Sequence, residues 1–237
     1  MMQYFNFTFR ELIDLAVSIL ALCVALTIAT FPGGLAGMMA EPLMIFPSML
    51  IYFIVITPAF ALHEFGHRTV AMKYGAHAHY QGFPLWILFM LIGAVVFGFV
   101  FAATGAVVIF AKYITPKENA EISLAGPRIN ILLAVLFVLA GMVAEVLIPA
   151  TAIKDIILLI FGASAYINAF LATFNMIPMF PLDGSKVLNY KISLWAFWFG
   201  VSILLLLFID ITMLSFVIFL TLFALIMTSL TRKVRFA

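Results

Sequence analysis

The segment His63-Glu64-Phe65-Gly66-His67 holds the residues of this chain that are best suited to chemistry. Its H-E-x-x-H spacing is typical of zinc peptidases, because helix positions four apart share a face and two imidazoles can then bind one metal. Glu64 stands beside them, where it can take a proton from a zinc-bound water. The alternative is a chance match, with two histidines hydrogen-bonded inside an apolar helix.

The setting of this motif indicates a membrane. No charged residue lies between Glu41 and His63, so the motif ends an apolar run long enough to cross a bilayer. Of the 237 residues, 66% are hydrophobic and 9% are charged, whereas about a quarter are charged in soluble domains. The sequence therefore predicts a multi-pass protein of the lipid bilayer, with a single domain over residues 1–237. The net charge of +2 gives no reason to expect a nucleic-acid partner.

Two further segments extend the match. Residues 175–184 read N-M-I-P-M-F-P-L-D-G, and Ala125-Gly126-Pro127 is followed by Asn130. Together with the H-E-x-x-H motif, and in the same order, these segments resemble the N-x-x-P-x-x-P-L-D-G and A-G-P-x-x-N elements of the site-2 protease family. That family comprises intramembrane zinc metalloproteases.

The resemblance implies a zinc metalloendopeptidase that cleaves a peptide bond in or near a transmembrane helix of a protein substrate. It implies that Zn²⁺ is the cofactor, that His63, His67 and Asp183 are its ligands, and that Glu64 and Asn175 are catalytic. Two histidines, one carboxylate and a water form a recognised catalytic zinc set. Asn175 would hold the substrate carbonyl or the oxyanion. The rival hypothesis is a membrane zinc transporter that uses the same His/Asp site.

The hydrophobic pattern predicts an all-α fold with about six transmembrane helices, a re-entrant hairpin and a small β element between helices 2 and 3. The predicted spans are 15–30, 42–75, 129–143, 156–178, 192–208 and 211–230. Asp183 can join the histidines only if the helix before it ends at the same membrane face as His67. That helix must therefore run in the same direction as the helix of the histidines, and the number of crossings between residues 75 and 125 must be even. We expect none, with residues 86–101 forming the re-entrant hairpin and a strand near residues 104–110. Two short crossings are the alternative.

Several polar and helix-breaking residues carry local predictions. Phe31-Pro32-Gly33-Gly34 is expected to break the first helix. Residues 75–84 read as a loop or short strand. His77 and His79 are expected to be an exposed loop pair, and a metal-binding pair on a strand is the alternative. Residues 117–121 read as a polar connector, and Gly126-Pro127 is expected to open the third helix. Pro178 and Pro181 are expected to end the fourth helix, and Gly184 to permit a tight turn.

Asn130 and Asn168 have two interpretations each, a helix–helix hydrogen bond or a role near the site. For Asn130 the two are equally open, and for Asn168 the packing role is favoured. Arg68 and Lys73 are expected to extend to a nearby membrane surface.

The distribution of basic residues predicts the topology. With six spans and both termini in the cytosol, Lys154 is outside and the other eleven of the 12 Lys and Arg residues are cytosolic, as expected from the positive-inside rule. This orientation places the zinc site toward the cytosolic side of the membrane.

Overall fold

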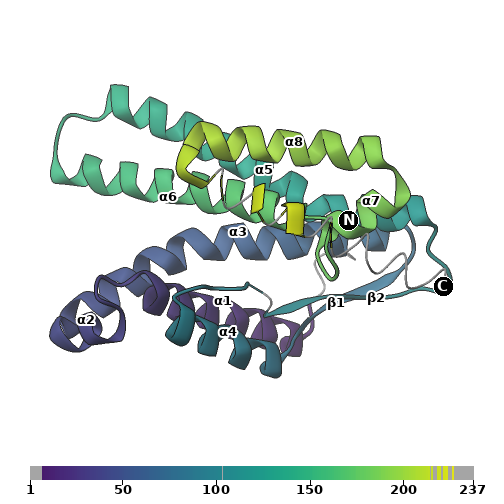
Figure 1. Cartoon of the computed structure of the whole chain (residues 1–237), viewed down its shortest axis with the longest axis horizontal. Helices are drawn as coiled ribbons and strands as arrows, with labels where there is room; N and C mark the ends of the chain where they lie inside the picture. Colours follow the sequence, from purple (N-terminus) through teal and green to yellow (C-terminus); the bar gives the residue numbers. More distant parts are fainter. Residues whose placement is uncertain are drawn as a thin grey trace. The chain divides into compact units, whose positions relative to one another are not determined.

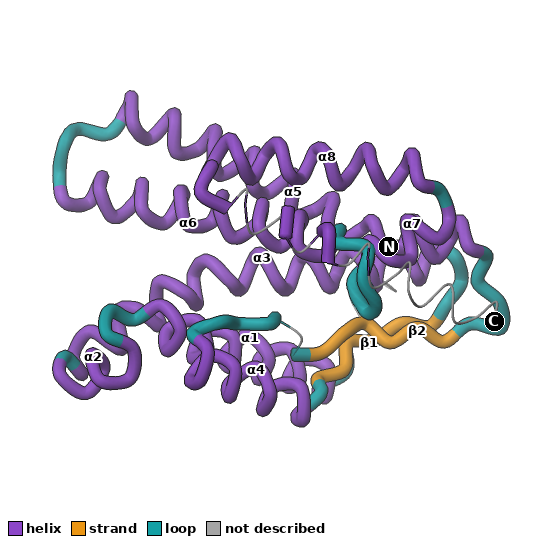
Figure 2. Tube along the Cα trace, in the orientation of Figure 1, coloured by secondary structure: helices purple, strands orange, loops and turns teal. Residues whose placement is uncertain are grey.

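The computed structural model describes residues 7–102, 104–213, 215, 218–219, 221–223 and 226. The chain divides into two compact units, residues 1–110 and 111–237, and each is described by itself (Figures 1 and 2). Among the described residues, five helices are long and apolar enough to cross a membrane: Phe9–Thr30, Pro42–Lys73, Pro116–Leu147, Ala152–Asn175 and Ile192–Ile209. Half of the sixth predicted span, residues 211–230, lies outside the described residues.

Helix α1 (Phe9–Thr30) begins six residues earlier than the predicted span. Thr8 accepts a hydrogen bond from the backbone N–H of Glu11, and the Glu11 carboxylate accepts one from the N–H of Thr8. This capping box starts the helix at Phe9. The helix ends at the predicted break, where Gly33 and Gly34 have positive φ angles, and the short helix α2 (Gly34–Ala40) follows.

The helix that carries the H-E-x-x-H motif is α3 (Ile45–Lys73), which follows a 3₁₀ turn at Pro42–Met44. It packs against α1, and Gly75 in the left-handed region (φ 75°) follows its end. The predicted second span is therefore confirmed as a helix, with its C-terminus at Lys73.

The predicted β element is present as strands β1 (His77–Gly82) and β2 (Gly105–Phe110), which pair antiparallel. Between them lies one helix, α4 (Pro84–Phe97), of 14 residues. Such a helix is about 21 Å long, shorter than the hydrocarbon core of a bilayer. Gly82 lies opposite Gly105, and the N–H of Phe83 donates to the carbonyl of Thr104 at 2.9 Å. The segment that contains α4 therefore leaves the sheet and returns to it.

In the second unit, α5 (Pro116–Leu147) and α6 (Ala152–Asn175) pack along each other. Two predictions about α5 were wrong. The helix begins at Pro116, because Thr115 and Glu118 form a capping box, so residues 117–121 are helical and not a connector. Pro127 consequently lies inside the helix and does not open it.

Two shorter helices follow α6 in the second unit. Helix α7 (Asp183–Tyr190) packs against α5, and α8 (Ile192–Ile209) packs against α6 and α7 (Figure 1). Helix α8 matches the predicted fifth span within one residue. A 3₁₀ turn at Ile211–Met213 follows it.

Candidate active site

The two histidines of the motif lie one turn apart on α3, with their side chains side by side. Their Nε2 atoms are 3.0 Å apart and their ring centroids 4.7 Å apart, and both residues are buried. Two nitrogens bound to one tetrahedral zinc are separated by about 3.3 Å, given Zn–N bonds of about 2.0–2.1 Å. The pair therefore fits two imidazole ligands of one metal ion. A neutral ring that offers Nε2 to a metal carries its proton on Nδ1.

Glu64 follows His63 directly and is about 100° around the helix from it. Its side chain is buried and lines a largely apolar cavity of about 290 Å³ in the first unit, together with Phe65 and Tyr80. A carboxylate on a candidate membrane-spanning helix is energetically costly, and such residues usually mark a functional site. Its position next to the histidine pair suits a residue that accepts a proton from a water on a metal bound there.

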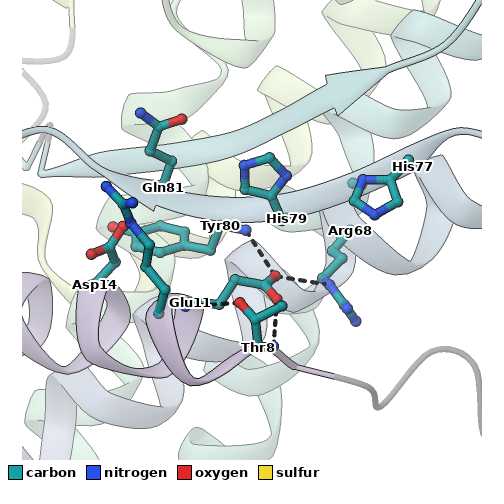
Figure 3. A pocket seen from close by; sticks show the side chains of 10 residues that line it. Thr8, Glu11, Asp14, Arg68, His77, His79, Tyr80 and Gln81 are labelled. Carbon is teal, nitrogen blue, oxygen red and sulfur yellow. Dashed lines mark hydrogen bonds and ion pairs between the residues drawn. The ribbon is translucent and has the colours of Figure 1, made fainter.

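Arg68 joins the end of the motif to the start of α1. Its Nε lies 3.4 Å from Glu11 Oε1, and both side chains are about 5% exposed or less. Glu11 also accepts hydrogen bonds from the N–H of Thr8 at 2.8 Å and of Tyr80 at 3.2 Å, as Figure 3 shows. The guanidinium of Arg68 stacks on Phe7 at 4.3 Å from the ring centroid. The expectation that Arg68 reaches the membrane surface was wrong, because this buried carboxylate pairs with it; Lys73 is exposed as expected.

Three polar side chains on one face of α1 hold strand β1. Beyond Glu11, the N–H of Gly82 donates to Asp14 Oδ2 at 3.1 Å, and the hydroxyl of Tyr80 donates to Ser18 at 2.8 Å. Burial raises the pKa of Tyr80 well above its ordinary range, so this hydroxyl remains a donor. On the edge of β1 that faces away from β2, the N–H groups of Tyr80 and Gly82 therefore donate to carboxylates.

Sequence reasoning missed this stripe, although it contained a signal. Glu11, Asp14 and Ser18 are spaced three and four residues apart in an otherwise apolar helix. That spacing places them on one face, and charged residues in such a helix call for a partner. The identity of the partner, the backbone of β1, depends on contacts about 70 residues away along the chain.

His77 and His79 lie on strand β1, so the short strand predicted as one of two forms for residues 75–84 is present, and the favoured interpretation of the pair as part of a loop was wrong. Residues two apart on a strand share a face, and their ring centroids are 5.9 Å apart. His79 also stacks on Phe110 of β2, with ring centroids 5.6 Å apart and planes 9° apart. Both line the polar cavity of about 450 Å³ that also contains Glu11 and Arg68 (Figure 3).

The other predicted site residues, Asp183 and Asn175, belong to the second unit. Helix α6 ends at Asn175, three residues before Pro178. Asp183 is buried as the first residue of α7, and Lys186 Nζ lies 3.6 Å from its Oδ1. The side-chain amide of Asn175 donates to the carbonyl of Leu171 at 3.0 Å.

The loop between these two residues depends on a close backbone approach at Gly184. A Cβ there would lie 2.1 Å from the carbonyl oxygen of Met176, which real side chains do not tolerate. Glycine is needed for this contact, and not for the turn that we predicted. The indole N–H of Trp195 also donates to Met176 O at 2.8 Å, so Met176 links the loop to α7 and α8.

Asn130 and Asn168 form an interhelical hydrogen bond within the second unit. Asn130 Nδ2 donates to Asn168 Oδ1 at 2.8 Å, and Asn168 donates to the carbonyl of Ser164 at 2.8 Å. Both asparagines are fully buried. This confirms the packing role for Asn168 and gives Asn130 the same role.

Comparisons with known proteins bear on the chemistry of this site. The model of peptidase family M50 matches residues 51–148, which include the H-E-x-x-H motif. A protein of Methanocaldococcus jannaschii named "Putative zinc metalloprotease MJ0611" is 37% identical over 195 residues, which are 82% of this chain and 92% of that protein. No solved structure matches.

Two more distant relatives have similar names. "Putative zinc metalloprotease Rip2" of Mycolicibacterium smegmatis is 27% identical over 72% of this chain and 69% of that protein. "Zinc metalloprotease MJ0392" of M. jannaschii is 25% identical over 60% of this chain and 34% of that protein. The names of the relatives indicate Zn²⁺ as the metal and proteolysis as the chemistry, and the imidazole pair fits a zinc site. The chain thus belongs to peptidase family M50, the site-2 protease family of zinc metalloproteases.

Proposed function

We propose that this protein is an intramembrane zinc metalloendopeptidase that cuts its protein substrate in or near a transmembrane helix. The observation that carries the proposal is the buried pair His63 and His67, with Nε2 atoms 3.0 Å apart, on a helix long and apolar enough to span a bilayer. His67 lies six residues before Lys73, or about 9 Å along the helix. The site would then lie inside the membrane, near one face.

We propose Asp183 as the third protein ligand and Asn175 as the residue that holds the substrate carbonyl or the oxyanion. The residue types support this, since two imidazoles and one carboxylate suit a zinc ion that keeps one position open. The buried position of Asp183 at a helix start and the close backbone approach of Gly184 to Met176 suit a residue that must hold one orientation. The two units would then act as one metalloprotease domain over residues 1–237.

Bound zinc would supply a Lewis acid and would lower the pKa of water toward neutrality. The protein's own contribution is proton transfer: Glu64 takes a proton from the attacking water and later gives it to the leaving amine. Glu64 suits this task because it is buried beside the histidine pair.

We further propose that the segment with α4 is re-entrant and that the sheet receives the substrate as an added strand. The 14-residue length of α4 and the return of the chain to β2 support the first point. The carboxylates of Glu11 and Asp14 on the β1 edge support the second, because they leave β2 as the strand that can accept a partner. Six spans, cytosolic termini and a zinc site toward the cytosolic leaflet complete the proposed topology. The transport hypothesis is not favoured, because the relatives are named as proteases.

The test is cleavage of a panel of transmembrane peptides by the purified protein in lipid vesicles, with and without a zinc chelator. We expect cleavage within or beside the apolar segment, loss of cleavage with the chelator and recovery after Zn²⁺ is returned. Cleavage only of soluble peptides, or cleavage that persists with the metal removed, would contradict the proposal.

A further inference from the structure

The apolar cavity beside Glu64 in the first unit has a wall from each of four elements. Its volume is about 290 Å³, and its apolar walls are Leu12 and Leu15 of α1, Leu62 and Phe65 of α3, and Val107 of β2. Tyr80 of β1 also lines it. We propose that this cavity receives a large apolar side chain of the substrate next to the bond that is cut. This inference rests on the proposed function.

The polar groups of the cavity restrict what it can hold. Arg68 is paired with Glu11 and stacked on Phe7, and the Tyr80 hydroxyl donates to Ser18. Glu64 is the proton acceptor of the proposed reaction. A charged or strongly polar substrate side chain would lose its polar partners among walls that are mostly hydrocarbon, which is unfavourable. An apolar side chain gains from the same burial.

The sheet places a substrate residue at the mouth of this cavity. Tyr80 and Val107 are directly opposite each other, and the N–H of Tyr80 points away from β2, toward Glu11. In an antiparallel pair, the backbone N–H and C=O groups of two directly opposite residues either bond to each other across the pair or both point away from it. The N–H and C=O of Val107 must therefore face the free edge of β2, where an added strand would bind.

The same register fixes the direction of the substrate side chain. Directly opposite residues in neighbouring strands project their side chains to the same face of a sheet. Tyr80 and Val107 both line the cavity, so a substrate residue paired with Val107 would place its side chain on the same face of the sheet. Its side chain would then contact the wall that contains Glu64. The residue in the cavity is thereby adjacent to the reacting bond, and the cavity sets the preference at that position.

Ala61 offers a direct way to change the size of the cavity. It lines the cavity from α3 and is half-buried, so Ala61→Leu adds bulk to the space without changing charge. Ala16 of α1 is exposed and does not line the cavity. Ala16→Leu is therefore a matched control, with the same chemical change on a neighbouring helix.

The experiment compares two substrates that differ at one position. The cleavage site of one transmembrane peptide is first found by mass spectrometry, and the residues on each side of it are then changed between Phe and Ala. At one of these positions the wild-type protein should prefer Phe by at least about tenfold in kcat/KM, the range of discrimination that an apolar pocket provides. Ala61→Leu should lower the Phe-to-Ala preference by at least about tenfold, and Ala16→Leu should leave it unchanged.

Each other result has a defined meaning. Equal cleavage of the Phe and Ala peptides by the wild type, or an equal effect of Ala61→Leu on both, would overturn the inference and would fit a cavity filled by lipid. If Ala61→Leu does not fold, Leu15→Ala is used instead. It enlarges the cavity and should raise the ratio of kcat/KM for a Trp peptide to that for a Phe peptide. An unchanged Trp-to-Phe ratio would also overturn the inference. Failure of the wild type to cut any transmembrane peptide would instead contradict the proposed function.

Discussion

Arg68 Nε lies 3.4 Å from Glu11 Oε1, and this buried ion pair joins the residue after the second histidine to the first turn of α1. Glu11 simultaneously binds the N–H of Tyr80 in β1. One carboxylate thus connects three elements of the first unit: the helix of the H-E-x-x-H motif, the first helix and the sheet. Glu11 therefore adds a polar link to the direct packing of the H-E-x-x-H helix against α1 and the sheet.

Loss of this carboxylate should destabilise the first unit strongly. Glu11→Ala leaves a buried guanidinium and a strand N–H without their partner, and breaking one side of a buried pair costs about 3–5 kcal/mol. The measurement is thermal unfolding in detergent. The matched control is Glu145→Ala, which removes the exposed partner of Lys154 and should cost no more than about 1 kcal/mol. Equal losses of stability in the two variants would show that the buried Glu11–Arg68 pair contributes no more to stability than an exposed pair.

A second prediction concerns the loop before Asp183. Gly184→Ala places a Cβ 2.1 Å from Met176 O, so the backbone must shift by more than an ångström and move Asp183 with it. Zinc content and cleavage should fall together, and the free energy of unfolding should fall by more than about 3 kcal/mol.

The control for this change is Gly162→Ala in α6, where an added Cβ meets nothing within 4 Å. This variant should fold with wild-type zinc content, because alanine is the better helix former by about 1 kcal/mol. A Gly184→Ala protein with normal zinc content would show that the close approach at Met176 is not needed for the metal site.

A third prediction tests the re-entrant segment. Single cysteines at His77 and Lys117, both exposed, are introduced in a Cys23→Ser background and labelled in sealed vesicles with a membrane-impermeant reagent. Because the chain returns from α4 to the strand that pairs with β1, both sites should be labelled from the same side. Labelling from opposite sides would mean that residues 83–104 cross the membrane once.

The features that could be predicted from sequence are those with a short-range cause. The spacing of His63 and His67 places two imidazoles side by side on one helix face, and the Gly33-Gly34 break and the span at 192–208 follow from local composition. Strand β2 was also predicted within one residue, because Gly105 bounds its apolar run.

The features that could not be predicted depend on long-range contacts or on competition between local signals. The proline at 127 is a helix-opening signal by itself, but the capping box of Thr115 and Glu118 starts the helix eleven residues earlier. The role of Gly184 depends on the carbonyl of Met176, which only the folded loop brings near. The role of Glu11 depends on Arg68 and β1, which are more than 50 residues away.

The most direct test of the account is the separation of metal binding from proton transfer in two variants. Glu64→Gln keeps the size of the side chain and both histidines, so zinc content should stay at one ion per chain while cleavage falls by about 10²–10⁴. His67→Ala removes one imidazole of the pair and should lose zinc and cleavage together. Metal analysis and peptide cleavage are measured on the same purified samples. Cleavage by Glu64→Gln at the wild-type rate, or loss of its zinc, would contradict the assignment of Glu64 as the base.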